Sequence, residues 1–81
     1  MINIRFFAIL RERLGVDSLA YEYSDEKTVD DIKQNIIARG EPWTLLAEQD
    51  VLIALNHTLT SASARVNDGD EIAFFPPVTG G

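Results

Sequence analysis

The residues of this chain best suited to chemistry are the last two, Gly80 and Gly81, which end the stretch F-F-P-P-V-T-G-G at residues 74–81. Because glycine has no Cβ atom, such an end can enter a channel closed to other dipeptides and can adopt backbone angles forbidden to them. The terminal carboxylate is an anion at neutral pH and a poor electrophile, so another protein must activate it, for instance as an acyl-adenylate. The alternative interpretation is an ordinary frayed terminus.

Two prolines, Pro76 and Pro77, separate this end from a hydrophobic run. Proline lacks a backbone N–H, so sheet pairing should stop there, and its fixed φ stiffens the segment that follows. We therefore expect a folded domain over residues 1–75 and an extended tail over residues 76–81. Such a tail spans ~20 Å when extended, which is enough to reach an active site buried in a partner.

Catalysis by the side chains of this chain is poorly supported. His57 is the one histidine, and it falls in a turn without an identifiable carboxylate to orient it. The chain has no cysteine, and no Gly-rich phosphate loop follows a strand, so we expect no permanently bound metal or cofactor. Residues 67–70 lack the spacing of a calcium loop and are typical of a turn. We expect a protein that is not catalytic alone, and any sulfur it uses must come from elsewhere.

Length and charge limit the classes of partner. The chain has 81 residues, enough for one small domain, and 13 acidic against 7 basic residues give a formal net charge of -6. The basic residues are scattered, so the concentrated positive footprint that nucleic acid or an anionic membrane requires is missing. A basic protein surface is the natural counterpart. The sequence shows no signal peptide and no long apolar run, so we expect a soluble cytoplasmic protein.

Alternation of apolar and polar residues predicts two strands near the start of the chain, over Ile2–Ile9 and Ser18–Ser24, paired as an antiparallel hairpin. Between them, Leu10–Leu14 should form one helical turn. The main helix is expected over about residues 28–39, because Thr28 is a suitable N-cap and apolar residues then recur at helical spacing.

The second half of the chain predicts a short helical turn within Glu41–Gln49 and then three strands, over Val51–Leu55, Thr58–Thr60 and Glu71–Phe75. One main helix over a mixed sheet of about five strands makes an α+β domain. The β-grasp arrangement fits best, with the first and last strands adjacent and parallel at the centre of the sheet.

Outward hydrophobic side chains on this sheet indicate a partner. In the β-grasp arrangement Phe7 and Phe75 both project from the face that the helix does not cover, and Leu59 can join them. A clustered set of this kind implies a covering partner. A loop of the same domain is the alternative cover, but a chain this short has few residues to spare for one.

The chain resembles the small, sulfur-carrier subunits of molybdopterin synthase, which are ubiquitin-like β-grasp proteins. The resemblance rests on F-F-A at residues 6–8, more loosely on an L-x-N-x-T pattern over residues 53–58, and on D-G-D-E-I-A-F-F-P-P-V-T-G-G at residues 68–81. It covers the whole length, and the last stretch carries its specificity. Gly-Gly alone would not, because ubiquitin-like modifiers and the thiamine sulfur carrier end in the same way.

This resemblance implies a mechanism at Gly81. An adenylyltransferase related to ubiquitin-activating enzymes would use ATP to adenylate the Gly81 carboxylate, and sulfur supplied through a cysteine desulfurase would convert it to a thiocarboxylate. The large catalytic subunit, in an assembly of two large and two small subunits, would use this sulfur to convert cyclic pyranopterin monophosphate to molybdopterin in molybdenum cofactor biosynthesis. Gly80 would let the tail pass to the active site. The implied partner-binding residues are Phe7, Leu59, Phe75, Pro76, Pro77, Val78 and Thr79.

Three other functions stay open at this level. The chain could be a ubiquitin-like modifier conjugated through Gly81 to lysines of target proteins. It could carry sulfur for thiamine synthesis or another pathway. It could also be an adaptor whose tail is incidental.

Overall fold

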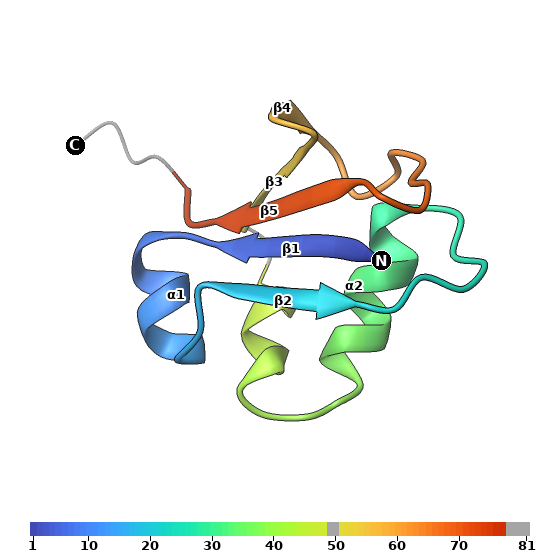
Figure 1. Cartoon of the computed structure of the whole chain (residues 1–81). Coiled ribbons are helices and arrows are strands. Elements are labelled where there is room, and N and C mark those ends of the chain that lie inside the picture. The colour runs from blue at the N-terminus through green and yellow to red at the C-terminus, as the bar shows by residue number, and fades with distance from the viewer. Residues whose placement is uncertain (49–50, 78–81) are drawn as a thin grey trace.

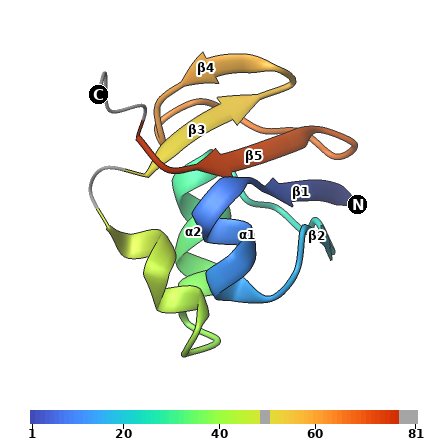
Figure 2. The ribbon, with the colours of Figure 1, turned by 90° about the vertical axis from the view of Figure 1, so that its left-hand side faces the viewer.

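The computed structural model describes residues 1–48 and 51–77, which form one mixed sheet with helices on one side (Figures 1 and 2). In chain order the elements are β1 (Ile2–Phe6), α1 (Ala8–Leu14), β2 (Ser18–Tyr21), α2 (Val29–Ile37), a 3-10 helix (Trp43–Ala47), β3 (Leu52–Leu55), β4 (Thr58–Thr60) and β5 (Glu71–Phe75). Figure 2 shows α1, α2 and the 3-10 helix together below the sheet. The opposite face, called the open face below, carries no described helix.

The described strands lie in the order β2-β1-β5-β3-β4. β1 and β5 pair in parallel at the centre of the sheet, whereas the three remaining pairs are antiparallel. The predicted β-grasp arrangement is therefore confirmed, including the adjacent first and last strands.

The core forms where the inward positions of the strands meet the apolar side of α2. In β1 buried residues alternate with exposed ones. In β5 buried residues alternate with partly buried ones. Three α2 residues, Val29, Ile32 and Ile36, are each 0% exposed against them. Burying one such side chain completely stabilises the fold by roughly 1.5–3 kcal/mol. The fully buried strand residues are Ile2, Ile4, Phe6, Ile72 and Phe74.

α2 begins at a capping box. The Thr28 hydroxyl accepts a hydrogen bond of 3.2 Å from the Asp31 backbone N–H, and the Asp31 carboxylate accepts one of 3.1 Å from the Thr28 N–H. Two backbone donors that the first turn of a helix leaves unpaired are thus satisfied. The helix predicted over residues 28–39 is confirmed, although it ends at Ile37, so Arg39 follows the last turn.

The strand expected over Ile2–Ile9 is wrong at its end, because it stops at Phe6 and Ala8 already begins α1. Ala8 has a φ of 55°, a left-handed angle that breaks the extended chain. Leu10 and Leu14 are then buried on one side of α1 at i, i+4 spacing. The single helical turn expected over Leu10–Leu14 is therefore a seven-residue helix.

The strand expected over Ser18–Ser24 is also shorter, ending at Tyr21. The chain bends there around Glu26, whose carboxylate accepts a hydrogen bond from the Tyr21 hydroxyl and one of 2.9 Å from the Ser24 backbone N–H. The charged Glu26 carboxylate accepts both hydrogen bonds, so the Tyr21 hydroxyl and the Ser24 N–H are paired without a longer strand.

Candidate functional site: the open face and the end of β5

The open face is built where β1 and β5 end side by side. Phe6 and Phe74 are register partners in the parallel pair, and both point into the core with their rings stacked 6.0 Å apart. Because side chains alternate along a strand, Phe75 must point the other way, and it is half-buried on the open face. The predicted outward position of Phe75 is confirmed, and Phe74 points inward.

Phe7 follows β1 and reaches the same face. Its backbone is extended, with φ −125° and ψ 156°, so it continues the alternation of the strand for one residue before α1 starts. Its side chain is 42% exposed, and the guanidinium carbon of Arg5 lies 5.8 Å from the centre of its ring. An arginine in this position is attracted by the face of the ring.

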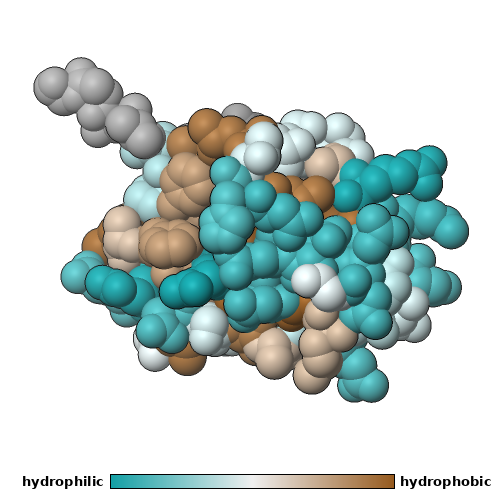
Figure 3. Space-filling model, turned by 45° about the horizontal axis from the view of Figure 1, so that its top comes forward, coloured by the Kyte–Doolittle hydropathy of each residue, from teal (hydrophilic) through white to brown (hydrophobic). Residues whose placement is uncertain are grey.

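Phe7 and Phe75 are two walls of one shallow hollow of about 360 Å³. Two alanines that are register partners, Ala54 in β3 and Ala73 in β5, line it as well. Small side chains there leave room between the phenylalanines. Figure 3 shows brown and tan hydrophobic side chains gathered at the end of the molecule where β5 finishes, beside teal polar ones. The remaining lining residues are Arg5, His57 and Glu71.

Leu59 lies on the same face but outside this hollow. It is the register partner of Ala54, which in turn faces Ala73, so it stands two strands away from β5. Its side chain is 66% exposed, the largest exposed fraction among the described large hydrophobic residues. The structure therefore brings Phe7 and Phe75 together and leaves Leu59 as a separate apolar point on β4.

Polar residues at the other end of the hollow were not predicted as site residues. The His57 Nε2 atom lies 3.4 Å from a carboxylate oxygen of Glu71, and the Asn3 side-chain amide donates to the other oxygen at 3.4 Å. Alternation along β5 could have placed Glu71 and Ala73 on this face with Phe75. Nothing in the sequence could have placed His57 there, because its position depends on the turn between β3 and β4.

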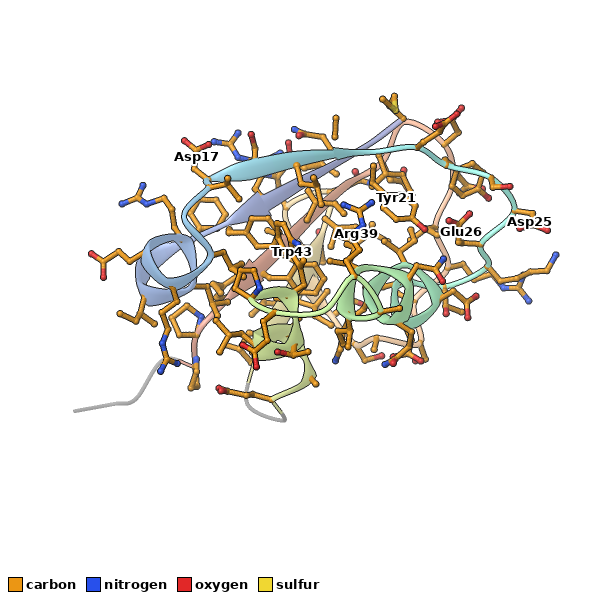
Figure 4. The ribbon with its side chains drawn as sticks, turned by 90° about the horizontal axis from the view of Figure 1, so that it is seen from below. Asp17, Tyr21, Asp25, Glu26, Arg39 and Trp43 are labelled. Atoms are coloured by element: carbon orange, nitrogen blue, oxygen red, sulfur yellow. The ribbon has the colours of Figure 1, made fainter. Side chains whose placement is uncertain are left out.

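The groups with shifted pKa values lie on the helix side of the sheet, not on the open face. Burial, followed by the hydrogen bond to Glu26, raises the pKa of Tyr21, whereas the same hydrogen bond lowers the pKa of Glu26. Asn35 of α2 donates a hydrogen bond of 2.8 Å to the Tyr21 hydroxyl. Figure 4 shows Tyr21, Glu26 and Arg39 pointing toward one another. This network links β2 to α2 and explains the shifts structurally.

The open face presents an apolar surface around Phe7 and Phe75 with polar residues at its edge. In residues 1–48 and 51–77, no cluster of histidine, aspartate or glutamate has the form of a metal site. No helix in the same part of the chain is long and apolar enough to cross a membrane. An aromatic hollow with a polar rim is instead the usual composition of a protein–protein contact.

The last predicted site residues follow this surface. Pro76 and Pro77 come directly after β5, are half-buried and belong to no strand. Val78, Thr79, Gly80 and Gly81 lie outside the described residues. Their roles are therefore argued from the sequence and from related proteins.

Comparison with known proteins places this geometry among small carrier and modifier proteins. The model of the ThiS family matches residues 4–81. The chain is 44% identical over 82 residues to the molybdopterin synthase sulfur carrier subunits of Haemophilus influenzae and Escherichia coli, with 100% of each chain covered. It is 30% identical over 90 residues to small archaeal modifier protein 3 of Haloferax volcanii, covering 99% of this chain and 98% of that relative.

A solved structure has the same fold. One chain of the complex of subunits 1 and 2 of the molybdopterin-converting factor from Helicobacter pylori matches with a TM-score of 0.64 and 23% identity. The match covers 99% of this chain and 97% of that chain. At this identity the likeness shows the fold alone.

Proposed function

This chain belongs to the ThiS family, and we propose that it is the sulfur-carrier subunit of a molybdopterin synthase. The observation that carries the proposal is the 44% identity, over the whole of both chains, to two molybdopterin synthase sulfur carrier subunits. The open face supports it physically, because it presents an aromatic contact surface next to the strand that leads into the Gly-Gly end.

In this proposal Gly81 carries the sulfur. An adenylyltransferase related to ubiquitin-activating enzymes joins the Gly81 carboxylate to the AMP part of ATP, and pyrophosphate leaves. The outer sulfur of a persulfide formed by a cysteine desulfurase then attacks the acyl carbon, so that a C–S bond forms and AMP departs. A thiol then cleaves the S–S bond of the resulting acyl disulfide, and this leaves the thiocarboxylate and a disulfide. The activation step is needed because the free carboxylate, an anion at neutral pH, resists nucleophilic attack. The chain itself needs no cysteine for this chemistry, and it has none.

The catalytic large subunit consumes the thiocarboxylate. It uses the sulfur to convert cyclic pyranopterin monophosphate to molybdopterin, and because the product holds two such sulfurs, two carriers are used for each molecule. Phe7, Phe75 and Leu59 bury their exposed area against this subunit while residues 76–81 reach its active site. We expect two large and two small subunits in the assembly and, since activation consumes ATP, action in the cytoplasm.

Intact-mass analysis tests the sulfur-carrier role. The chain is incubated with the activating enzyme, ATP and a sulfur source, and we expect one oxygen of the terminal carboxylate to be replaced by sulfur. The thiocarboxylate form is then supplied to the large subunit with cyclic pyranopterin monophosphate, and molybdopterin should form. Sulfur loading without product formation would assign the carrier to another pathway, whereas an unchanged mass would overturn the proposal.

A second function is favoured by one specific observation, the 30% identity to small archaeal modifier protein 3. A modifier uses the same activated C-terminus but transfers it to an amine, so an amide forms in place of a thiocarboxylate. The mass experiment separates the two functions when target proteins are included. Adducts linked through Gly81 to lysine side chains would indicate a modifier, and their absence beside a loaded thiocarboxylate would indicate a carrier alone.

A further inference from the structure

We propose that Asn56 is a positioning residue, which holds β4 against the start of β5 and so fixes Leu59 on the open face for docking. This inference rests on the docking surface of the proposed function. Asn56 is the first residue of the two-residue turn that joins β3 and β4. It does not line the hollow itself, and its effect on a partner is transmitted through the strand that follows it.

Two hydrogen bonds tie Asn56 to Glu71, the first residue of β5, and a third ties it to Asp70 just before that strand. Its backbone N–H donates to the Glu71 carbonyl oxygen at 2.8 Å, and the Glu71 N–H donates to its side-chain Oδ1 at 2.9 Å. Its Nδ2 donates to a carboxylate oxygen of Asp70 at 3.1 Å. Two of the three bonds need the side chain, and all three join segments that are distant in the sequence. The turn is therefore fastened to the centre of the sheet, not only to its own hairpin.

β4 gains from such a fastening because, among the described strands, it pairs with β3 alone. It lies at the edge of the sheet, it has three residues, and all of them are exposed. A strand that buries no side chain gains little from the core, and a short hairpin is marginally stable by itself. The pairing with β3 and the bonds of Asn56 therefore determine where β4 lies.

The consequence for binding falls on Leu59. Its side chain contacts the partner from a strand two places away from Phe75, and the turn sets the separation of these two points. If β4 shifts freely, the partner must order it during association, which costs affinity. A fixed turn removes that cost before the partner arrives.

The backbone of the turn explains why asparagine suits the position. Asn56 has a φ of 50° and His57 one of 71°, the left-handed pair of angles of a tight hairpin turn. Asparagine tolerates this region and also carries both a donor and an acceptor. Glycine tolerates the same region without either group. The substitution Asn56→Gly therefore removes the two side-chain hydrogen bonds while leaving the backbone angle accessible.

A double-mutant cycle tests the route through Leu59. The affinity of the full chain for the large subunit is measured for wild type, Asn56→Gly, Leu59→Ala and the double variant. We expect Asn56→Gly to weaken binding about 5-fold in the wild-type background and by less than about 2-fold in the Leu59→Ala background. The second effect is smaller because Asn56 acts on binding through the Leu59 side chain. Hydrogen exchange should show faster exchange of the β4 amides in Asn56→Gly, with β1 and β5 still protected.

Asn35→Ala is the matched control. It removes the 2.8 Å bond to the Tyr21 hydroxyl on the helix side, so it loses stability without touching the open face. Its affinity for the large subunit should stay within about 2-fold of wild type. Additive effects of Asn56→Gly and Leu59→Ala, or unchanged β4 protection, would overturn the positioning role. If the wild-type chain fails to bind or to transfer sulfur, the proposed function itself is wrong.

Discussion

The backbone N–H of Phe7 donates a hydrogen bond of 3.2 Å to the carbonyl oxygen of Phe74. This bond carries the parallel pairing of β1 and β5 one residue beyond Phe6, and it places Phe7 beside Phe75 on the open face. Phe74 itself points into the core and is 0% exposed. Two adjacent phenylalanines of one strand therefore have different tasks, since one stabilises the fold and the other is available for binding.

Phe75→Ala and Phe74→Ala should separate these tasks. We expect Phe75→Ala to weaken binding to the large subunit by at least about 10-fold, because aromatic side chains at the centre of a contact carry much of its energy. Its loss of stability should be small. Phe74→Ala leaves a cavity in the core and should cost about 3–5 kcal/mol of unfolding free energy. Chemical denaturation and binding titrations of both variants measure the two effects. Normal binding by Phe75→Ala would remove it from the contact.

Deletion of Gly81 should abolish sulfur transfer and leave the stability of the domain unchanged. In the proposed function this residue supplies the reacting carbon, but it has no side chain that could be buried in the core. Thermal unfolding of the shortened chain should therefore match that of wild type, while intact-mass analysis should detect no thiocarboxylate. A marked fall in melting temperature would show that the tail contributes to the fold, contrary to the division at residue 75.

The sequence predicted the strands and the main helix well where side-chain alternation or capping dominates. Thr28 with Asp31, and Ile72 with Phe74, are local signals, and the structure follows them. The resemblance to molybdopterin synthase sulfur carriers, based mainly on the last fourteen residues, is likewise confirmed by the comparisons. The end of β1 was not predicted, because it depends on the left-handed backbone angle at Ala8, and an alanine gives no sequence signal for that angle.

The candidate site was predicted only in part, because some of its residues are placed by local alternation and others by long-range contacts. Strand alternation identified Phe7 and Phe75 as outward residues, and the structure brings them to one hollow. His57 reaches that hollow as the second residue of the turn between β3 and β4, which Asn56 ties to Asp70 and Glu71 by long-range hydrogen bonds without a sequence signature. Ala54 and Ala73 carry no sequence signal of a site, although their small size leaves the space between the phenylalanines.

Acid should weaken the link between β2 and α2. The hydrogen bond from Tyr21 holds the folded pKa of Glu26 below its ordinary value of 4.5, so the unfolded chain binds more protons between these two values. The stabilisation is present above pH 4.5 and is lost as the pH falls through the folded pKa. Urea unfolding of wild type and Tyr21→Phe between about pH 6 and about pH 3 should show a smaller acid loss in the variant, which lacks this donor.

Tyr23→Phe is the control for this pH effect. The Tyr23 hydroxyl donates to the backbone carbonyl oxygen of Glu26 at 3.0 Å, not to the carboxylate. The variant should therefore lose stability at every pH, by about 1 kcal/mol, and keep the acid dependence of wild type. Equal acid dependence in Tyr21→Phe and wild type would show that the Tyr21 hydrogen bond does not set the pKa of Glu26.

Glycine substitutions at the two positions of the turn between β3 and β4 should have opposite effects on stability. His57 has a φ of 71°, a left-handed angle that costs a residue with a Cβ atom more than it costs glycine, and a tight turn of this type prefers Asn-Gly. Its contact with Glu71 is worth little, because the imidazole is 85% exposed. His57→Gly should therefore raise the unfolding free energy by about 0.5–1 kcal/mol.

Asn56→Gly should instead lower the unfolding free energy, since it gives up two side-chain hydrogen bonds to Asp70 and Glu71. Equilibrium denaturation of both variants under the same conditions measures the difference in sign. A loss of stability in His57→Gly equal to that in Asn56→Gly would mean that the left-handed angle at residue 57 carries no strain. Opposite signs would show that the backbone angle at His57 lowers the stability of the turn, whereas the side-chain hydrogen bonds of Asn56 raise it.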